Sequence, residues 1–89
     1  MKLTEEVTIV NQLGLHARAA TKLVQLCQQF DARIELTQEG KSADASSVLA
    51  LLMLASSKGK TVQISAEGDD AQAALTAVTT LVRNGFDES

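Results

Sequence analysis

The chain has 89 residues, a formal net charge of −3, two phenylalanines and no tryptophan, tyrosine or proline. This length suits one small domain, which we expect to span residues 1–89 and to have a core of aliphatic side chains. The acidic balance argues against nucleic-acid binding, which needs a basic surface, and no segment approaches the roughly 20 apolar residues of a membrane span.

The N-terminal third predicts one strand and one helix. Residues 3–10 are partly alternating and rich in β-branched side chains, which indicates a strand that stops before residues 11–14. From residue 17 to residue 30, apolar side chains recur at the spacing of a helix that buries one face: Ala20, Leu23, Val24, Cys27 and Phe30.

The middle third predicts a hairpin and a second helix. Residues 33–37 alternate strictly, as in a half-buried strand, and a turn at 38–41 leads to a short return arm at 42–44. Residues 46–57 indicate a helix with a serine N-cap, and we expect Gly59 at the C′ position that ends it.

The last third predicts a strand at 61–67 and a final helix. The helix starts at residues 68–70, where two aspartates favour the positive end of the helix dipole, and Asn84 and Gly85 end it. The order is therefore β-α-β-β-α-β-α. Four strands with the helices on one face predict a two-layer α+β sandwich.

The only histidine, His16, lies between the first strand and the first helix, two residues after Gly14. The first N–H groups of a helix have no partner within the helix, and with the helix dipole they attract anions. This potential favours a neutral imidazole with a nucleophilic nitrogen. Because the guanidinium of Arg18 suits phosphate oxygens, the pattern points to a phosphoryl group carried on the ring.

Other interpretations of the reactive side chains stay open. A histidine at a loop-to-helix junction is commonly an exposed surface residue. A metal site is not expected, because zinc needs roughly three or four ligands and the chain has no second histidine. The single cysteine, Cys27, is interpreted as core packing rather than as a reactive thiol, and it fits a reducing, cytoplasmic location.

The segment GLHARAA, residues 14–20, resembles the active-site segment of HPr proteins, the histidine phosphocarriers of the bacterial phosphoenolpyruvate-dependent phosphotransferase system. The resemblance covers essentially the whole chain. Residues 46–54, the pair Lys58 and Gly59, and residues 85–88 are most similar to the nitrogen-related members of that family. The resemblance implies an open-faced β-sandwich with a four-stranded antiparallel sheet and three helices on one face.

The same resemblance implies the roles of the site residues. His16 would be phosphorylated at Nδ1, and Arg18 and the backbone N–H of Ala17 would bind the phosphate, with no cofactor. The donor would be a nitrogen-branch Enzyme I and the acceptor a IIA-type protein. The protein would be a monomeric carrier with a regulatory role rather than one in sugar uptake.

Two positions depart from the family pattern. Ala19 stands where the family commonly has proline, which would preset the backbone angle in the first helical turn. The start of the helix is therefore less constrained, which bears on the transfer rate. Leu13 stands where sugar-type members often have asparagine, so no role is assigned to it.

The second predicted helix has more apolar side chains than one face can bury. We expect part of them, Val48, Leu49 and Leu52, to form a docking surface for the partners, although they can also fill a core poor in aromatic rings. Ser47 matches the position of a regulatory serine in some HPr proteins. The alternative is that Ser46 or Ser47 serves only as the helix N-cap.

Two other functions are compatible with the residues. One is a non-catalytic interaction or small-ligand module of similar fold, in which His16 contributes only local packing. The other is an acyl-carrier-type protein, because residues 44–47 before an apolar helix resemble the site of a prosthetic-group serine. The alternating strands at 33–37 and 61–67 argue against this second function, since such carriers are helical.

Overall fold

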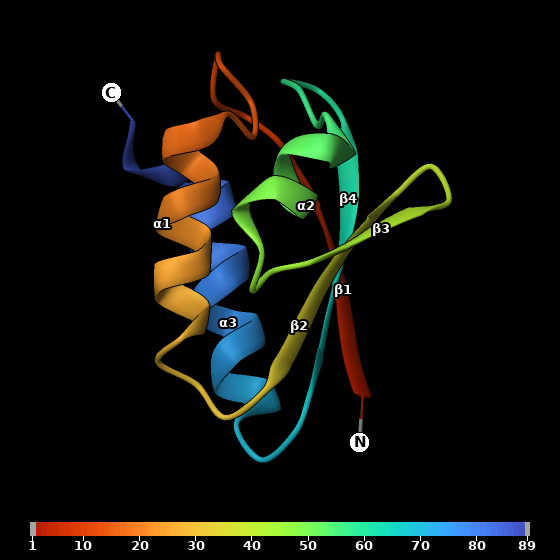
Figure 1. Ribbon diagram of the computed structural model, residues 1–89, viewed down its shortest axis with the longest axis vertical. Helices are drawn as coiled ribbons and strands as arrows, with labels where there is room; N and C mark the ends of the chain where they lie inside the picture. Colours follow the sequence, from red (N-terminus) through yellow and green to blue (C-terminus); the bar gives the residue numbers. More distant parts are fainter. Residues whose placement is uncertain (1, 89) are drawn as a thin grey trace.

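The structure is a computed structural model that describes residues 2–88 (Figure 1). Its strands are β1 (Lys2–Thr8), β2 (Arg33–Gln38), β3 (Lys41–Asp44) and β4 (Thr61–Glu67). Its helices are α1 (Ala17–Cys27), α2 (Val48–Leu54) and α3 (Ala71–Arg83), followed by a short 3₁₀ turn, η1 (Gly85–Asp87). Among these residues, no helix is both long and apolar enough to cross a membrane.

The four strands form one antiparallel sheet in the order β1-β4-β2-β3. The central strand β4 pairs with β1 on one side and with β2 on the other, so that Ile64 lies opposite both Glu5 and Leu36. The helices lie on one side of this sheet and leave the other side open (Figure 1). The predicted α+β open-faced sandwich and the predicted element order are confirmed.

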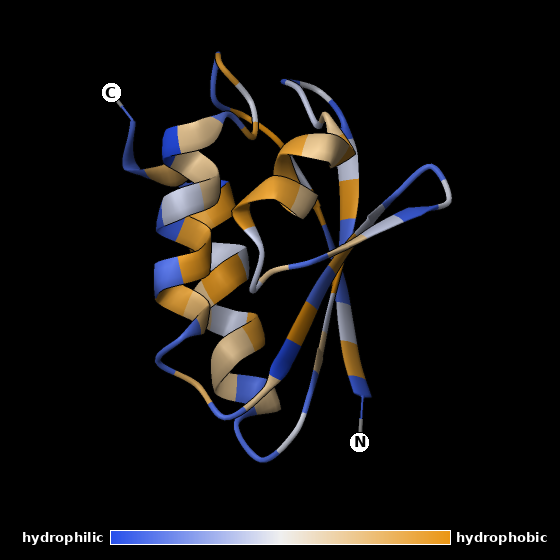
Figure 2. Cartoon of the chain, viewed as in Figure 1, coloured by the Kyte–Doolittle hydropathy of each residue, from blue (hydrophilic) through white to orange (hydrophobic). Residues whose placement is uncertain are grey.

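The core lies between the sheet and the helices. In β4, the alternate residues Val62, Ile64 and Ala66 are buried, while Thr61 and Gln63 are exposed on the open face. Figure 2 shows the hydrophilic residues concentrated in the turns, most clearly at the tip of the β2–β3 hairpin. Each fully buried Leu, Ile or Val side chain contributes about 1.5–3 kcal/mol, which lets a nearly aromatic-free core hold the fold.

Two element ends differ from the sequence prediction. α1 ends at Cys27 rather than at residue 30, because the chain tightens: the N–H groups of Gln29 and Phe30 donate to carbonyls only three residues back, at 3.1 and 3.2 Å. β1 ends at Thr8 rather than at residue 10. The N–H of Ile9 still donates to the Lys60 carbonyl at 2.9 Å, outside the strand pairing.

The end predicted for the second helix is wrong. α2 stops at Leu54, and Ala55 rather than a glycine takes the left-handed conformation at its end, with φ +55°. The carbonyl of Ser56, just beyond, accepts a hydrogen bond from Leu15 at 2.9 Å, which ties this segment to the first loop. Gly59 lies in the later turn before β4 and has φ +92°.

The last helix starts where it was predicted, and the side chain of Asp70 has a further role. Asp70 is the N-cap of α3, but its side chain makes no capping hydrogen bond, and the first turn of α3 holds no acidic residue. The Asp70 carboxylate instead accepts a hydrogen bond from the N–H of Asp31 at 2.7 Å. It therefore joins the start of α3 to the loop between α1 and β2.

Candidate functional site

His16 is the N-cap residue of α1, with extended backbone angles of φ −82° and ψ −179°. Its ring nitrogen Nδ1 accepts a hydrogen bond from the N–H of Arg18 at 3.3 Å, and its carbonyl accepts the first helical bond from Ala20 at 2.8 Å. An acceptor side chain that satisfies a free N–H of the first turn is the usual role of an N-cap. The start of the helix therefore fixes the orientation of the ring.

The segment just before His16 is held against the loop that follows α2. Gly14 has φ +64°, and a Cβ at this position would lie 2.5 Å from the carbonyl oxygen of Ser56. Next to it, the buried Leu15 donates to that same oxygen at 2.9 Å. Only glycine allows both the left-handed backbone and this close approach.

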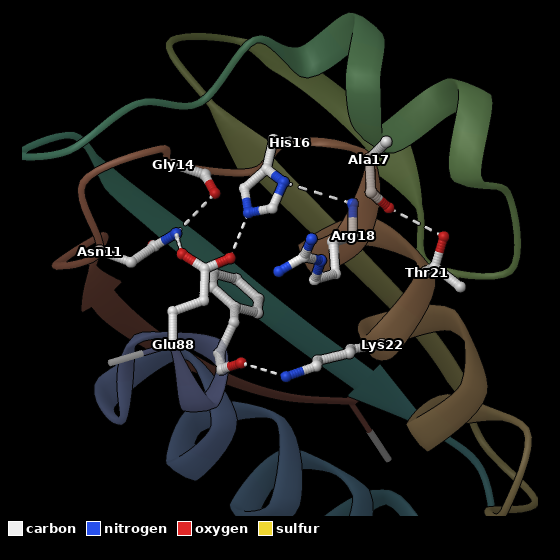
Figure 3. A network of polar contacts seen from close by, with 9 residues as sticks. Asn11, Gly14, His16, Ala17, Arg18, Thr21, Lys22 and Glu88 are labelled. Carbon is white, nitrogen blue, oxygen red and sulfur yellow. Dashed lines mark hydrogen bonds and ion pairs between the residues drawn. The ribbon is translucent and has the colours of Figure 1, made fainter.

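The other ring nitrogen of His16 faces the C-terminal segment (Figure 3). Nε2 makes a hydrogen bond with Oε2 of Glu88. The second carboxylate oxygen, Oε1, accepts a hydrogen bond at 3.0 Å from Nδ2 of Asn11, which also donates to the Gly14 carbonyl at 2.8 Å. Asn11, Glu88 and His16 thus form one chain of hydrogen bonds from the β1–α1 loop to the ring.

These contacts define the tautomer of His16. An ionised carboxylate only accepts hydrogen bonds, so Nε2 carries the proton that it shares with Glu88. Nδ1 accepts from Arg18, so it holds a lone pair. The hydrogen bond from Asn11 holds the pKa of the Glu88 carboxyl below its usual value of 4.5, and the hydrogen bond from His16 lowers it further. Glu88 is therefore ionised at neutral pH, and Nδ1 is the ring nitrogen with a lone pair.

The C-terminal turn η1 places Glu88 beside His16. Phe86 is completely buried and has φ +57°, and Asp87 continues the turn with φ +62°. The carbonyl of Phe86 accepts a hydrogen bond from Nζ of Lys22 at 2.9 Å, which ties the turn to α1. The aromatic anchor and this bond hold the backbone of the turn that leads to Glu88.

Two cationic side chains of α1, Arg18 and Lys22, follow His16 in the chain. Arg18 is exposed, and in the view of Figure 3 its guanidinium lies between the His16 ring and the Lys22 amine. Both side chains line an open hollow of about 550 Å³, together with residues 10–13, Asp87 and Glu88. The His16 side chain is 24% exposed, so part of the ring is accessible from solvent.

The serine and the apolar residues predicted around α2 take different positions. Ser47 is the N-cap of α2, and its Oγ accepts from the N–H of Ala50 at 3.1 Å. Leu49 and Leu52 are exposed, whereas Val48 is partly buried against the core. Met53, which the sequence analysis did not single out, is 72% exposed.

The remaining predicted groups make no second reactive site. Burial, together with the nearby Asp44 carboxylate, raises the pKa of the Cys27 thiol to about 12, so the thiolate is scarce at neutral pH. Cys27 packs partly buried against the core, in line with its structural interpretation. Within residues 2–88, no group of three or more His, Cys, Asp or Glu side chains could hold a metal ion.

The sequence analysis missed Asn11, Lys22 and Glu88. Glu88 is separated from His16 by 72 positions, so no local spacing joins them. Asn11 reads in the sequence as a turn residue at the end of a strand. The only available signal was that the C-terminal residues 85–88 form part of the family resemblance.

Comparison with known proteins gives matches over nearly the whole chain. A family model described as "PTS HPr component phosphorylation site" matches residues 3–84. Phosphocarrier protein NPr of Shewanella violacea is 54% identical over 88 residues, which cover 99% of this chain and 97% of that protein. Phosphocarrier protein NPr of Escherichia coli K12 is 48% identical over 89 residues, which cover 99% of each chain.

The fold matches as well as the sequence. The crystal structure of HPr-C-His from Thermoanaerobacter tengcongensis aligns with a TM-score of 0.93 at 34% identity and covers 98% of each chain. A phosphocarrier protein HPr from Bacillus anthracis aligns with a TM-score of 0.87 at 33% identity, over 91% of this chain and 96% of that one.

Proposed function

Because this chain belongs to the HPr family of phosphotransferase-system phosphocarriers, we propose that it carries a phosphoryl group on Nδ1 of His16. The donor is a nitrogen-branch Enzyme I, the acceptor is a IIA-type protein, and the role is regulatory. The observation that carries this proposal is the hydrogen bond that Nδ1 accepts from the N–H of Arg18 at the start of α1. The same proposal has the protein acting as a monomer in the cytoplasm.

The transfer needs no proton to leave the ring. The Nδ1 lone pair attacks the phosphorus of the phosphorylated donor, and the bond between phosphorus and the donor breaks as the Nδ1–P bond forms. Nε2 keeps its proton, so the phosphorylated ring carries a positive charge that the Glu88 carboxylate offsets. In the onward step, a ring that holds this proton is a better leaving group than one that has lost it.

The first turn of α1 stabilises the added phosphoryl group. When Nδ1 bonds to phosphorus, the N–H of Arg18 loses its acceptor and becomes free to bind a phosphoryl oxygen. The N–H of Ala17 has no partner within the helix and adds a second donor. The guanidinium of Arg18 offsets the remaining negative charge.

The choice of the nitrogen branch rests on the two NPr relatives, which are 48% and 54% identical to this chain. We expect phosphoenolpyruvate-dependent transfer to this protein to be at least about tenfold faster from nitrogen-branch Enzyme I than from the sugar-branch enzyme; that ratio is about 1.4 kcal/mol. The ratio is measured by quenching transfer reactions at successive times with each donor, at equal levels of donor phosphorylation. Equal rates would contradict the branch assignment while leaving the carrier role intact.

The exposed side chains of α2 support a docking surface, which we define as Leu49, Leu52 and Met53. We expect Leu49→Asp to slow transfer by about tenfold or more at low carrier concentration, because a charge replaces an apolar contact at the interface. Ala73→Asp, at an exposed position in the first turn of α3, is the matched control and should leave the rate unchanged. An unchanged rate in a folded Leu49→Asp protein would remove Leu49 from the docking surface.

A further inference from the structure

The Asn11 side chain joins two separate parts of the site. It is 5% exposed, and its single amide nitrogen donates both to the Gly14 carbonyl in the β1–α1 loop and to the carboxylate of Glu88 in the C-terminal segment. Its oxygen Oδ1 is buried and has no hydrogen-bond partner among residues 2–88. A buried acceptor without a partner is unfavourable. Both hydrogen bonds of this side chain are donated by its nitrogen.

We propose that Asn11 is a positioning residue for phosphoryl transfer, which holds the Glu88 carboxylate on Nε2 of His16 and thereby keeps Nδ1 unprotonated. This inference rests on the proposed function, in which Nδ1 is the attacking atom. Asn11 does not touch the reacting atoms. It acts through Glu88, in the way that a carboxylate oriented by a neighbour fixes the tautomer of a histidine.

Competition from Arg18 explains why Glu88 needs a second anchor. Arg18 lies close enough for its charge to act on the Glu88 carboxylate, and a guanidinium binds a carboxylate strongly through two parallel hydrogen bonds. Without Asn11, Glu88 is free to turn from His16 to Arg18. Nε2 would then lose its acceptor, and the guanidinium that suits the phosphoryl group would be occupied.

The chemistry of an amide fits this task. Asparagine donates to the carboxylate without adding charge, so it neither repels Glu88 nor attracts the incoming phosphoryl group away from His16. Lysine at this position would offer the phosphoryl group a competing cation, and aspartate would repel Glu88. The bond to the Gly14 carbonyl fixes the amide relative to the segment that leads into His16.

The test compares Asn11→Leu, of similar volume, and the smaller Asn11→Ala with the wild type. The ¹⁵N chemical shifts of the His16 ring at pH 7.5 distinguish a protonated from an unprotonated Nδ1. We expect nearly pure Nε2–H tautomer in the wild type, a mixture of both tautomers in the variants, and a transfer rate lowered by about tenfold. Gln63→Ala, at an exposed position on the open face of β4 and away from the site, should change neither quantity.

A double-variant experiment separates the action through Glu88 from simple loop anchoring. Glu88→Ala leaves the bond between Asn11 and Gly14 in place, and we expect it to reproduce the tautomer mixture. Asn11→Leu combined with Glu88→Ala should then be no slower than the slower single variant. Wild-type ring shifts in a folded Asn11→Leu or Asn11→Ala protein, or fully additive rate losses, would overturn the inference.

The proposed function and this inference fail in different ways. If an active donor does not phosphorylate the wild type, the proposed function fails, while the ring shifts still report whether Asn11 sets the tautomer. If the wild type is phosphorylated on His16 and the Asn11 variants keep its tautomer and rate, only the inference fails.

Discussion

Replacing Gly14 with alanine is expected to lower the free energy of unfolding by about 2–4 kcal/mol, which corresponds to a fall in Tm of roughly 10–25 °C. Two costs add. The left-handed backbone at φ +64° disfavours any side chain by about 1–2 kcal/mol. The new Cβ would also lie 2.5 Å from the Ser56 carbonyl oxygen and 2.8 Å from Cα of Ser57, and backbone atoms cannot turn aside as a flexible side chain can.

Gly40→Ala is the matched control for that prediction. Gly40 lies in the turn between β2 and β3 with φ +82°, and an added Cβ meets nothing within 4 Å. This variant should show only the conformational cost of about 1–2 kcal/mol. Thermal unfolding of both variants isolates the cost of the close approach at Gly14. Equal losses of stability would show that the contact with the loop after α2 does not hold the segment before His16.

The second large effect is expected from His16→Asn, which should reduce phosphoryl labelling by at least about 100-fold with little loss of stability. Asparagine is a favoured N-cap, so its Oδ1 can take over the hydrogen bond from Arg18 and keep the start of α1. An amide nitrogen has no available lone pair with which to attack phosphorus. The variant therefore removes the nucleophile and leaves the helix start intact.

Labelling from phosphoenolpyruvate and thermal unfolding, measured on the same samples, check this prediction. His16→Ala should lose both the label and about 1 kcal/mol of stability, because it also removes the cap. Comparison of the two variants separates the chemical role of the ring from its structural one. Labelling of the His16→Asn protein at the wild-type level would show that another residue carries the phosphoryl group.

Local patterns in the sequence predicted the elements well and their ends less well. Alternation identified β2 and β4, and the apolar spacing from Ala20 to Cys27 identified α1, because a half-buried strand or helix must repeat with its own period. The end of α2 was missed because tertiary contacts decide it. The Ser56 carbonyl accepts a hydrogen bond from Leu15 in a loop distant in sequence. Ala55 has a left-handed backbone angle, which an alanine in a sequence does not predict.

The site divides in the same way. His16, Ala17 and Arg18 lie within one helical turn, so residue chemistry and the properties of a helix N-terminus were enough to group them. Glu88 reaches His16 because Phe86 is buried and because Phe86 and Asp87 have left-handed backbone angles. Together these features turn the segment that ends in Glu88 back toward α1. The spacing of residues in the sequence does not predict this contact between Glu88 and His16.

The sequence predicted that some apolar side chains of α2 are exposed, but not which ones. Its apolar side chains outnumber the positions that a seven-residue helix can bury. The rotation of the helix over β3 and α1 then decides which are covered: Leu51 and Leu54 are buried, whereas Leu49 and Met53 are exposed. The sequence does not state that rotation, which explains why Val48 was included and Met53 was not.

In the proposed function, Nδ1 of His16 carries the phosphoryl group. The most direct test is a ³¹P–¹⁵N correlation spectrum of the ring-labelled protein after phosphorylation by phosphoenolpyruvate and nitrogen-branch Enzyme I, with the donor shown to be active on a known carrier. We expect phosphorus coupled to Nδ1, with a proton retained on Nε2. Phosphorus coupled to Nε2 would contradict the assignment of the reacting atom, and no phosphoryl group on the folded protein would favour a non-catalytic interaction module.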